Sequence, residues 1–246
     1  MTAIIKIEDL KRDFQVGTET VHALRGVSFE IQPHEFVAIM GTSGSGKSTM
    51  LNILGCLDKP SAGHYYIDGI DMSQCSKDEL STIRNHKIGF VFQSYNLLPR
   101  TTAIEQVELP LLYNNAVSAK ERLERAEHAL EQVGMENRRN HTPNQMSGGQ
   151  QQRIAIARAL VNDPVILLAD EATGNLDTRT SYEIMSLFQK LNEEGKTIGF
   201  VTHEPDIATF TKRVVMLRDG HVVKDYPVDT KSAQAALESL PASDDY

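Results

Sequence analysis

The sequence predicts an α/β fold in which a mostly parallel sheet is combined with an antiparallel β subdomain near the N-terminus and a helical subdomain farther along. Three observations support this prediction. A glycine-rich loop at residues 41–49 lies between an apolar run and a helical pattern. Apolar runs at residues 88–92, 165–169 and 197–201 have the length and composition of buried strands. Residues 95–146, in contrast, contain no long strand signal.

Composition limits the kind of protein. The chain has 246 residues, 40% of them hydrophobic and 24% charged, which is typical of a soluble globular protein, and residues 1–246 are expected to form one domain. A net charge of −8 argues against broad nucleic-acid binding, which needs a surface that neutralises phosphates. Cys56 and Cys75 lack metal-site spacing and are expected to be reduced thiols. Neither a signal peptide nor an apolar run of ~20 residues is visible, so we expect contact with a membrane only through a partner.

The antiparallel strands are predicted in the first part of the chain. Residues 3–7 form one candidate, and residues 64–68 another. Residues 21–24 and 27–31 alternate around Arg25-Gly26, as in a hairpin. These short alternating runs predict an antiparallel sheet beside the parallel one.

The glycine-rich loop matches the pattern G-x-x-x-x-G-K-[ST]. Between a strand and a helix this pattern indicates a phosphate-binding loop and a core of the P-loop NTPase type, whereas an ordinary glycine-rich turn would not need both flanks. Glycines let successive backbone N–H groups turn inward, and the helix N-terminus adds positive potential. Lys47 is expected to reach the β- and γ-phosphates, and Ser48 to bind Mg²⁺. The loop consists of Gly41, Thr42, Ser43, Gly44, Ser45, Gly46, Lys47, Ser48 and Thr49.

Two adjacent carboxylates follow the apolar run at residues 165–169. Asp170 and Glu171 at a strand end are costly unless a cation or hydrogen-bond donors face them. With a phosphate loop present, Mg²⁺ is the expected cation, supported by Asp170. Glu171 is expected to act as a general base that polarises the attacking water. A solvated turn fits poorly after five apolar residues.

Polar residues follow four of the predicted strands: Lys47, Gln93, Asp170 with Glu171, and His203. In a largely parallel sheet the ligand crevice lies outside the carboxyl ends of the strands. We therefore expect these side chains to meet at one edge of the sheet. A lone histidine is usually structural, but His203 directly follows a strand, as the others do.

The helical subdomain is predicted at residues of about 95–160. Residues 118–121 form a capping box, and a helical apolar pattern follows, with Gly134 as its stop. The apolar positions are Leu123, Ala126, Leu130 and Val133. Two apolar pieces at residues 97–99 and 109–112 fit either interior packing or a docking surface.

Two further features have more than one explanation. Ser147 is a good N-cap for the apolar helix that follows it, and the adjacent glycines leave the N–H groups at the helix start unobstructed, although plain capping explains this equally well. Phe14 lies in a polar stretch, where an exposed ring could stack on a base or join a small local cluster. A final hairpin is predicted around Asp219-Gly220, followed by a short helix and tail at about 229–246.

Taken together, these motifs resemble the ATP-binding subunit of an ABC transporter, from Phe14 to about Tyr226. The matching segments are residues 41–49, Gln93, residues 146–151, Asp170-Glu171, residues 174–177 and His203. The resemblance implies ATP and Mg²⁺ as ligands and a head-to-tail homodimer. Ser147 and Gly149, with the neighbouring Gly148 and Gln150, would then complete the ATP site of the other copy.

The resemblance also implies roles for single residues. Phe14 stands where an aromatic ring stacks on adenine, and His203 where a histidine contacts the γ-phosphate. Gln93 is assigned to the metal together with Ser48 and Asp170, and to coupling with the membrane partner. Three departures from the family pattern, Phe14 for Tyr, Met146 for Leu and Ala172 for Pro, remove no catalytic group, so we expect an active ATPase.

Residues 92–99, 105–110 and 174–177 resemble the macrolide-exporter and lipoprotein-release (MacB/LolD-like) group. This implies a separate, FtsX-like integral membrane permease and a cytoplasmic, peripheral location on the inner face of the membrane. ATP hydrolysis by this subunit would power export, lipoprotein release or mechanical work across the envelope. The alternative is a non-transport ABC ATPase that regulates cell-wall remodelling or division through a permease-like partner.

Two other classes fit less well. A zinc hook, a long coiled coil or a second ATP site would favour a soluble ABC ATPase acting on DNA or ribosomes, and none of these features is visible in the sequence. A small-molecule P-loop kinase would explain the phosphate loop but not residues 146–151 or His203.

Overall fold

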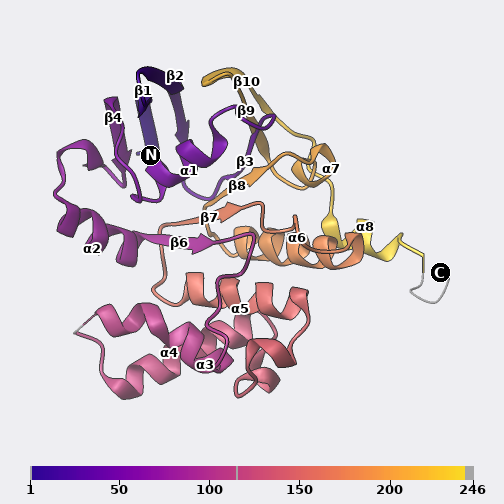
Figure 1. Ribbon diagram of the computed structural model, residues 1–246. Coiled ribbons are helices and arrows are strands. Elements are labelled where there is room, and N and C mark those ends of the chain that lie inside the picture. The colour runs from indigo at the N-terminus through magenta and orange to yellow at the C-terminus, as the bar shows by residue number, and fades with distance from the viewer. Residues whose placement is uncertain (1, 115, 242–246) are drawn as a thin grey trace.

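Two sheets and a layer of helices form the fold in the computed structural model, which describes residues 2–114 and 116–241 (Figure 1). One sheet has the strand order β2-β1-β4-β5, and the other β10-β9-β3-β8-β7-β6. The strands are β1 (Ile5–Val16), β2 (Glu19–Ile31), β3 (Phe36–Met40), β4 (Ala62–Ile67), β5 (Ile70–Asp71), β6 (Ile88–Val91), β7 (Ile166–Asp170), β8 (Ile198–Thr202), β9 (Arg213–Arg218) and β10 (His221–Pro227). The helices are α1 (Lys47–Leu54), α2 (Lys77–Lys87), α3 (Ala103–Glu108), α4 (Ala119–Gln132), α5 (Gly148–Leu160), α6 (Thr178–Glu193), α7 (Pro205–Ala208) and α8 (Ala233–Glu238), with short 3₁₀ turns at Met72–Gln74, Leu109–Tyr113, Glu136–Arg138 and Pro143–Gln145.

The larger sheet is parallel except for its last strand. Strands β9, β3, β8, β7 and β6 are parallel to their neighbours, and β10 pairs antiparallel with β9. Every residue of β3 and β8 is buried, which explains why the sequence shows continuous apolar runs rather than alternation. Phe36, Phe188 and Phe200 pack edge to face or tilted on one face, with ring centroids 5.4–6.3 Å apart. The mixed α/β fold with a mostly parallel sheet is thus confirmed.

The smaller sheet corrects one prediction. Residues 21–24 and 27–31 belong to a single strand, β2, which pairs with β1 along its length, so Arg25-Gly26 is not a hairpin turn. The register shifts between Ile7 and Leu10 and again between Leu10 and Lys11, where Asp9 of β1 has a φ of 47° and faces Gly26 of β2 with a φ of 87°. A Cβ on Gly26 would lie 2.6 Å from Asp9 Oδ1. This is a β-bulge, and its glycine gives the same sequence signal as a turn.

The helical layer consists of α3, α4 and α5 below the parallel sheet (Figure 1). Ser118 caps α4 by accepting a hydrogen bond from the Glu121 backbone N–H at 3.3 Å, but the Glu121 carboxylate pairs with Arg125, so the predicted capping box is only half formed. Ala126, Leu130 and Val133 are buried as predicted, whereas Leu123 is 39% exposed. The buried stripe of α4 is therefore narrower than the sequence indicated.

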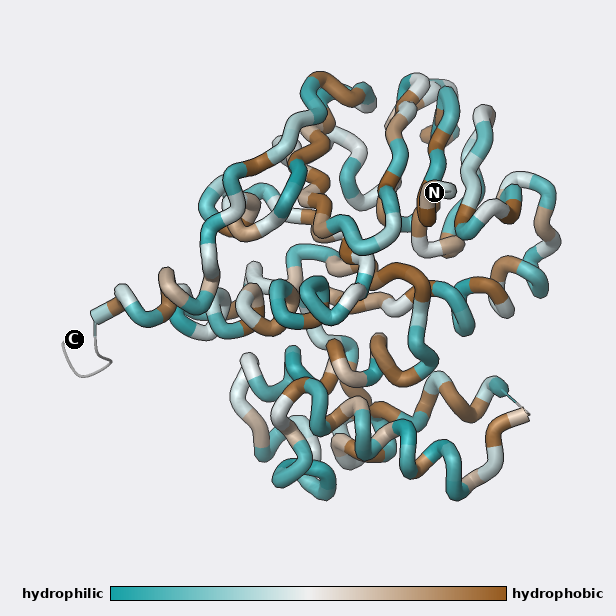
Figure 2. The backbone as a smooth tube through the Cα atoms, turned by 180° about the vertical axis from the view of Figure 1, so that it is seen from behind, coloured by the Kyte–Doolittle hydropathy of each residue, from teal (hydrophilic) through white to brown (hydrophobic). Residues whose placement is uncertain are grey.

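The hydrophobic interior follows this architecture. Brown apolar segments run through the strands of the parallel sheet, and the helical layer carries teal polar stretches (Figure 2). Cys56 is buried, and burial raises the pKa of its thiol to about 12, while Cys75 is also a free thiol. Among residues 2–114 and 116–241, no helix has the length and apolar character needed to cross a bilayer.

Candidate functional site

The glycine-rich loop connects β3 to α1 at the carboxyl edge of the parallel sheet. Gly46 forms the N-cap of α1 with a φ of 103°, and a Cβ there would lie 2.7 Å from the Ala23 carbonyl oxygen. Gly44 has a φ of 79° and open space around it. Glycine is therefore required at Gly46 by both conformation and close approach to β2, and at Gly44 by conformation alone.

Lys47 folds back into the loop. Its Nζ donates to the carbonyl oxygens of Gly41 at 2.7 Å and Thr42 at 3.1 Å, and the residue is only 9% exposed. Ser45 is 2% exposed, and its Oγ has no hydrogen-bond partner among the described residues. The first turn of α1 contains no acidic residue. A cation, an unpaired hydroxyl and a helix N-terminus thus form a cradle suited to an anion.

Asp170 ends β7 close to this cradle. Burial and the neighbouring Glu171 carboxylate raise the pKa of Asp170, while the Lys47 ammonium opposes them. A half-buried carboxylate in these surroundings favours an additional cation. No cluster of three or more His, Cys, Asp or Glu side chains that could hold a metal occurs among the described residues. A metal here would need hydroxyl, amide or phosphate oxygens as well, which suits Mg²⁺.

Glu171 and His203 are in direct contact. The His203 Nδ1 lies 2.9 Å from Glu171 Oε1, so Nδ1 carries the proton and donates to the carboxylate. The Glu171 backbone N–H donates to the Val201 carbonyl at 3.0 Å, and its own carbonyl accepts from Gly174 at 2.9 Å. With a φ of 44°, Glu171 is held in a left-handed conformation. These bonds fix the carboxylate at the ends of β7 and β8.

Gln93 lies beside the turn that follows Glu171. The Asn175 side chain donates to the Gln93 carbonyl at 3.1 Å. A Cβ on Gly174 would lie 2.9 Å from the Gln93 side-chain nitrogen, so the absence of a side chain at Gly174 makes room for Gln93. The adjacent parallel strands β6, β7, β8 and β3 thus bring the predicted residues to one edge of the sheet.

Ser147 is the N-cap of α5. Its Oγ accepts from the Gln150 N–H at 3.3 Å, and the Gln150 side chain accepts from the Ser147 N–H at 3.0 Å. A Cβ on Gly149 would lie 2.4 Å from Thr180 Cγ2 of α6. Gly149 therefore also permits close helix packing, a role that the sequence did not reveal. Figure 1 places α5 in the helical layer and α1 on the other side of the parallel sheet.

Phe14 lies on β1 and is 36% exposed. The Arg12 guanidinium lies 4.5 Å from the centre of its ring and forms two hydrogen bonds to Asp58, at 2.8 and 2.9 Å. Sequence reasoning missed Arg12, although side chains two positions apart on a strand share a face. The Phe14 ring therefore has a cation on one face.

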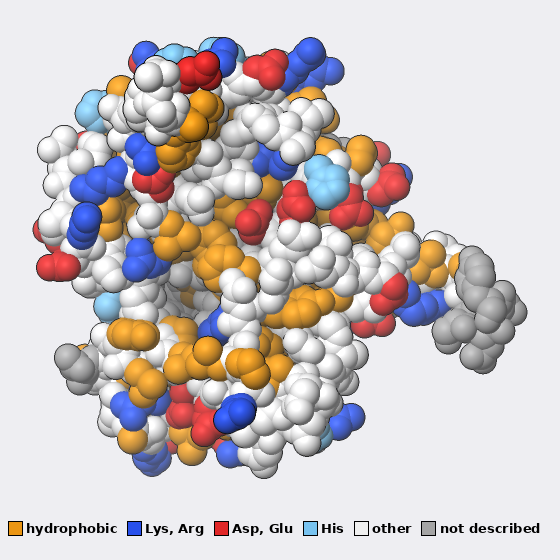
Figure 3. Space-filling model, viewed as in Figure 1, with side chains coloured by type: hydrophobic (Ala, Val, Ile, Leu, Met, Phe, Trp, Pro, Cys, Tyr) orange, Lys and Arg blue, Asp and Glu red, His pale blue; other side chains and the backbone are white. Residues whose placement is uncertain are grey.

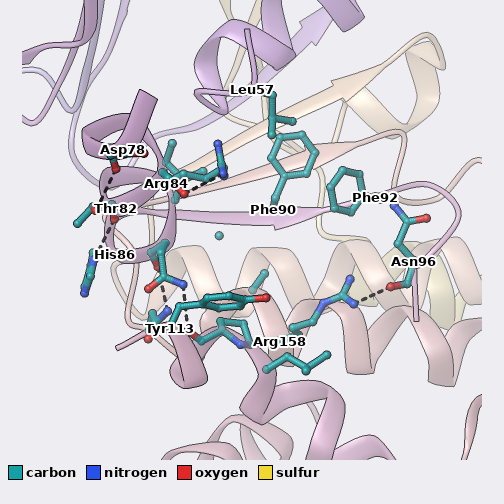
Figure 4. A pocket seen from close by; sticks show the side chains of 18 residues that line it. Leu57, Asp78, Thr82, Arg84, His86, Phe90, Phe92, Asn96, Tyr113 and Arg158 are labelled. Atoms are coloured by element: carbon teal, nitrogen blue, oxygen red, sulfur yellow. Dashed lines mark hydrogen bonds between the residues drawn. The ribbon is translucent and has the colours of Figure 1, made fainter. Parts of the chain in front are cut away.

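A groove of about 820 Å³ lies between α2 and β6 on one side and the helical layer on the other. Figure 3 shows hydrophobic and basic side chains around this hollow. In Figure 4, Leu57, Phe90 and Phe92 line one side, and Tyr113 and Arg158 the other. Leu57 and Tyr113 are 49% and 80% exposed. The groove was not predicted as such, because it is formed by segments far apart in the sequence.

The two apolar segments at residues 97–99 and 109–112 each contain a residue that packs in the interior and a residue that is exposed. Leu97 packs against the core, and Leu111 is fully buried. Leu98 and Leu112 are 50% and 55% exposed. Interior packing explains the first two residues, and the exposed pair is available to a partner.

Comparison with known proteins gives a consistent result. The profile of the family described as "ABC transporter" matches residues 24–174. YknY of Bacillus subtilis, an uncharacterized ABC transporter ATP-binding protein, is 53% identical over 220 residues, which cover 89% of this chain and 95% of YknY. The macrolide export ATP-binding/permease protein MacB of Syntrophobacter fumaroxidans is 49% identical over 240 residues, which cover 94% of this chain and 34% of MacB.

A solved structure is also similar. The ATP-binding cassette MJ0796 of Methanocaldococcus jannaschii, a dimer in a post-hydrolysis state with ADP and phosphate bound, matches with a TM-score of 0.83 and 49% identity. The match covers 92% of this chain and 100% of that chain. A match of this extent includes both sheets and the helical layer.

Proposed function

Because this chain belongs to the ABC transporter family and is an ATP-binding, ATP-hydrolysing subunit of that family, we propose that it powers a separate membrane permease from an ATP site shared between two copies. The contact between Glu171 and His203, at the ends of adjacent parallel strands, carries this proposal. It places a fixed carboxylate near the carboxyl edge where Lys47 and Asp170 also lie.

The phosphates of ATP bind at the loop of residues 41–49. The Lys47 ammonium exchanges the carbonyl oxygens of Gly41 and Thr42 for β- and γ-phosphate oxygens, which carry more negative charge. Backbone N–H groups at the start of α1 surround the same phosphates. The Phe14 ring stacks on adenine, and Arg12 strengthens that stack from the opposite face.

Glu171 orients the attacking water and accepts its proton. His203 donates from Nδ1 to Glu171 and so fixes the carboxylate, and a contact from Nε2 to the γ-phosphate requires a second ring proton, because only an N–H can donate to a phosphate oxygen. Lys47 stabilises the charge that develops on the phosphate oxygens. The residues that fit Mg²⁺ are Ser48, Gln93 and Asp170. When bound, Mg²⁺ would neutralise phosphate charge and polarise the γ-phosphate.

A second copy completes each site. The start of α5 presents the exposed Ser147 and the N–H groups of Gly148 and Gly149, yet α5 lies on the other side of the parallel sheet from α1, which follows the phosphate loop. A head-to-tail homodimer brings this helix N-terminus to the γ-phosphate in the other copy. The dimeric state of MJ0796 supports this arrangement.

The groove between α2, β6 and the helical layer receives a cytoplasmic segment of the permease. Its exposed apolar rim, including Leu57 and Tyr113, and its position beside Gln93 support this assignment. The similarity to MacB supports a permease of the FtsX-like type. The protein then lies at the cytoplasmic face of the membrane, held there by its partner.

Replacing Glu171 with Gln tests the proposed site. Glu171→Gln removes the base but keeps the hydrogen-bonding shape, so ATP binding is retained, turnover falls by at least about 10²-fold and an ATP-bound dimer accumulates. Glu194→Gln, the same change at the end of α6, serves as the control and leaves turnover unchanged. Normal steady-state hydrolysis by Glu171→Gln would exclude Glu171 as the base.

A further inference from the structure

The backbone beyond Gln93 passes through a left-handed conformation at two successive positions. Tyr95 and Asn96 have φ values of 58° and 51°. Asparagine tolerates this region, whereas a bulky aromatic residue enters it only when its surroundings enforce it. Contacts from outside the segment therefore hold this shape.

Arg158 of α5 provides these contacts. One terminal nitrogen of its guanidinium donates to the Tyr95 carbonyl at 2.8 Å, and the other to the Asn96 carbonyl at 2.7 Å. Figure 4 shows the bond to Asn96 as a dashed line. A planar guanidinium holds its donors in a fixed geometry, so it fixes the relative position of two carbonyls as a lysine cannot.

No acidic side chain pairs with Arg158 within residues 2–114 and 116–241. The residue is half-buried, and this burial lowers the pKa of its guanidinium. A desolvated cation without a counter-ion depends on its hydrogen bonds for compensation. The two carbonyl groups of Tyr95 and Asn96 provide that compensation.

Tyr95 is also held by the opposite end of α5. A Cβ on Gly148 would lie 2.8 Å from Tyr95 Oη, so the tyrosine hydroxyl lies against the first residue of the helix. Arg158 belongs to the last turn of that helix. The segment that begins at Gln93 is thus held along the length of α5.

We propose that Arg158 is a positioning residue for ATP hydrolysis, which holds Tyr95 and Asn96 and thereby sets the place of Gln93 in the ATP site. This inference rests on the role proposed above for Gln93. Arg158 also lines the groove. A partner segment that contacts the guanidinium therefore acts on the same two hydrogen bonds and, through them, on Gln93.

A double-mutant cycle between Arg158 and Gln93 tests this inference. Arg158→Met removes the donors, keeps an unbranched stem, and should lower kcat about tenfold with an unchanged Kd for ATP. Arg158→Lys, which offers a point charge instead of a fork, should recover only part of the rate. In a Gln93→Ala background, Arg158→Met should have no further effect on kcat, because its influence passes through Gln93.

The matched control is Arg153→Met on the same helix. Arg153 is also half-buried and donates to a backbone carbonyl, that of Val133 at 3.1 Å, but it does not bind the Gln93 segment. The kcat of Arg153→Met should be unchanged. Losses that multiply in the double variant would overturn the inference, as would a fully active Arg158→Met. An unchanged kcat for Gln93→Ala alone would instead overturn the proposed role of Gln93. Should Arg158→Met fail to fold, the same cycle with Arg158→Lys gives the decision.

Discussion

Asp170 and Glu171 are neighbours whose surroundings give them different chemistry. Asp170 is half-buried, its pKa is raised, and it lies within the field of Lys47. Glu171 is fixed by His203 and by two backbone hydrogen bonds in a left-handed conformation. One carboxylate is thus suited to a cation and the other to a water molecule, as is expected when two acids in one site have different environments.

Asp170→Asn should stabilise the nucleotide-free protein at neutral pH. Well below the ordinary pKa of 3.8 both the folded and the unfolded states hold the proton, so the ionisation of Asp170 then contributes nothing to stability. As the pH rises past that value the unfolded chain loses its proton first, and folding becomes less favourable until the raised pKa is passed. We expect Tm at pH 7.5 to rise by about 1–3 °C, and less as the pH falls.

Thermal melts across pH provide the measurement for Asp170→Asn, with the exposed Asp229→Asn as the control. The wild-type protein should also gain more stability from ATP and Mg²⁺ than Asp170→Asn does, because the bound cation relieves the isolated charge. A lower Tm for Asp170→Asn at pH 7.5 would show that the Asp170 charge stabilises the nucleotide-free fold.

Some site residues could be predicted from the sequence and others could not. The residues that follow the parallel strands were predictable, because each lies directly after a recognisable buried run and the strand ends share one edge. Arg12 and Arg158 were not, because their partners, Asp58 and Tyr95, are 46 and 63 positions away. Such contacts depend on how segments meet in space, which no local pattern encodes.

At the scale of elements, α5 and α6 pack through a contact that only glycine permits. Gly149 is buried against Thr180, whose Oγ1 in turn donates to Asp177, the N-cap of α6. The sequence indicated glycine for open N–H groups at a helix start. The structure shows that the same residue also sets how closely the two helices approach.

Gly149→Ala should lower the free energy of unfolding by about 1–3 kcal/mol, because the new methyl group would lie 2.4 Å from Thr180 Cγ2. Adding Thr180→Ser removes that methyl group and keeps the hydroxyl bonded to Asp177, so much of the stability should return. Urea unfolding of the two single variants and the double variant measures this coupling. Equal losses in Gly149→Ala with and without Thr180→Ser would show that the contact is not the cause.

The prediction of elements failed where pairing was irregular. Continuous apolar runs identified β6, β7 and β8 to within one or two residues. The bulge in β2 gives the same sequence signal as a hairpin, because the sequence does not show that Gly26 faces Asp9 on the neighbouring strand.

At the scale of the whole molecule, the groove extends from the exposed rim at Leu57 and Tyr113 to Phe92 and Asn96, which flank the segment that begins at Gln93. Leu57→Asp together with Tyr113→Asp should reduce co-purification of the membrane permease by about tenfold or more and leave basal ATP hydrolysis unchanged, because both side chains are exposed on the rim. Leu123→Asp, an exposed position on α4, is the control. Undiminished recovery of the permease with the rim variant would exclude the groove as its docking site.

A second copy of the chain also matters at the scale of the whole molecule. Helix α1, which follows the phosphate loop, and helix α5 lie on different sides of the parallel sheet (Figure 1). We therefore propose that each anion-binding surface is completed by the complementary surface of a second copy.

Sedimentation of Glu171→Gln with and without Ser147→Arg, in the presence of ATP and Mg²⁺, tests this account most directly. Without the second change, ATP should give a dimer. With Ser147→Arg the chain should bind ATP but stay a monomer, because the larger side chain would fill the space in which Ser147 contacts the γ-phosphate bound to the other copy. Ser118→Arg, which alters the N-cap of α4 instead, should leave the dimer intact. An ATP-dependent dimer that persists undiminished with Ser147→Arg would contradict the shared site.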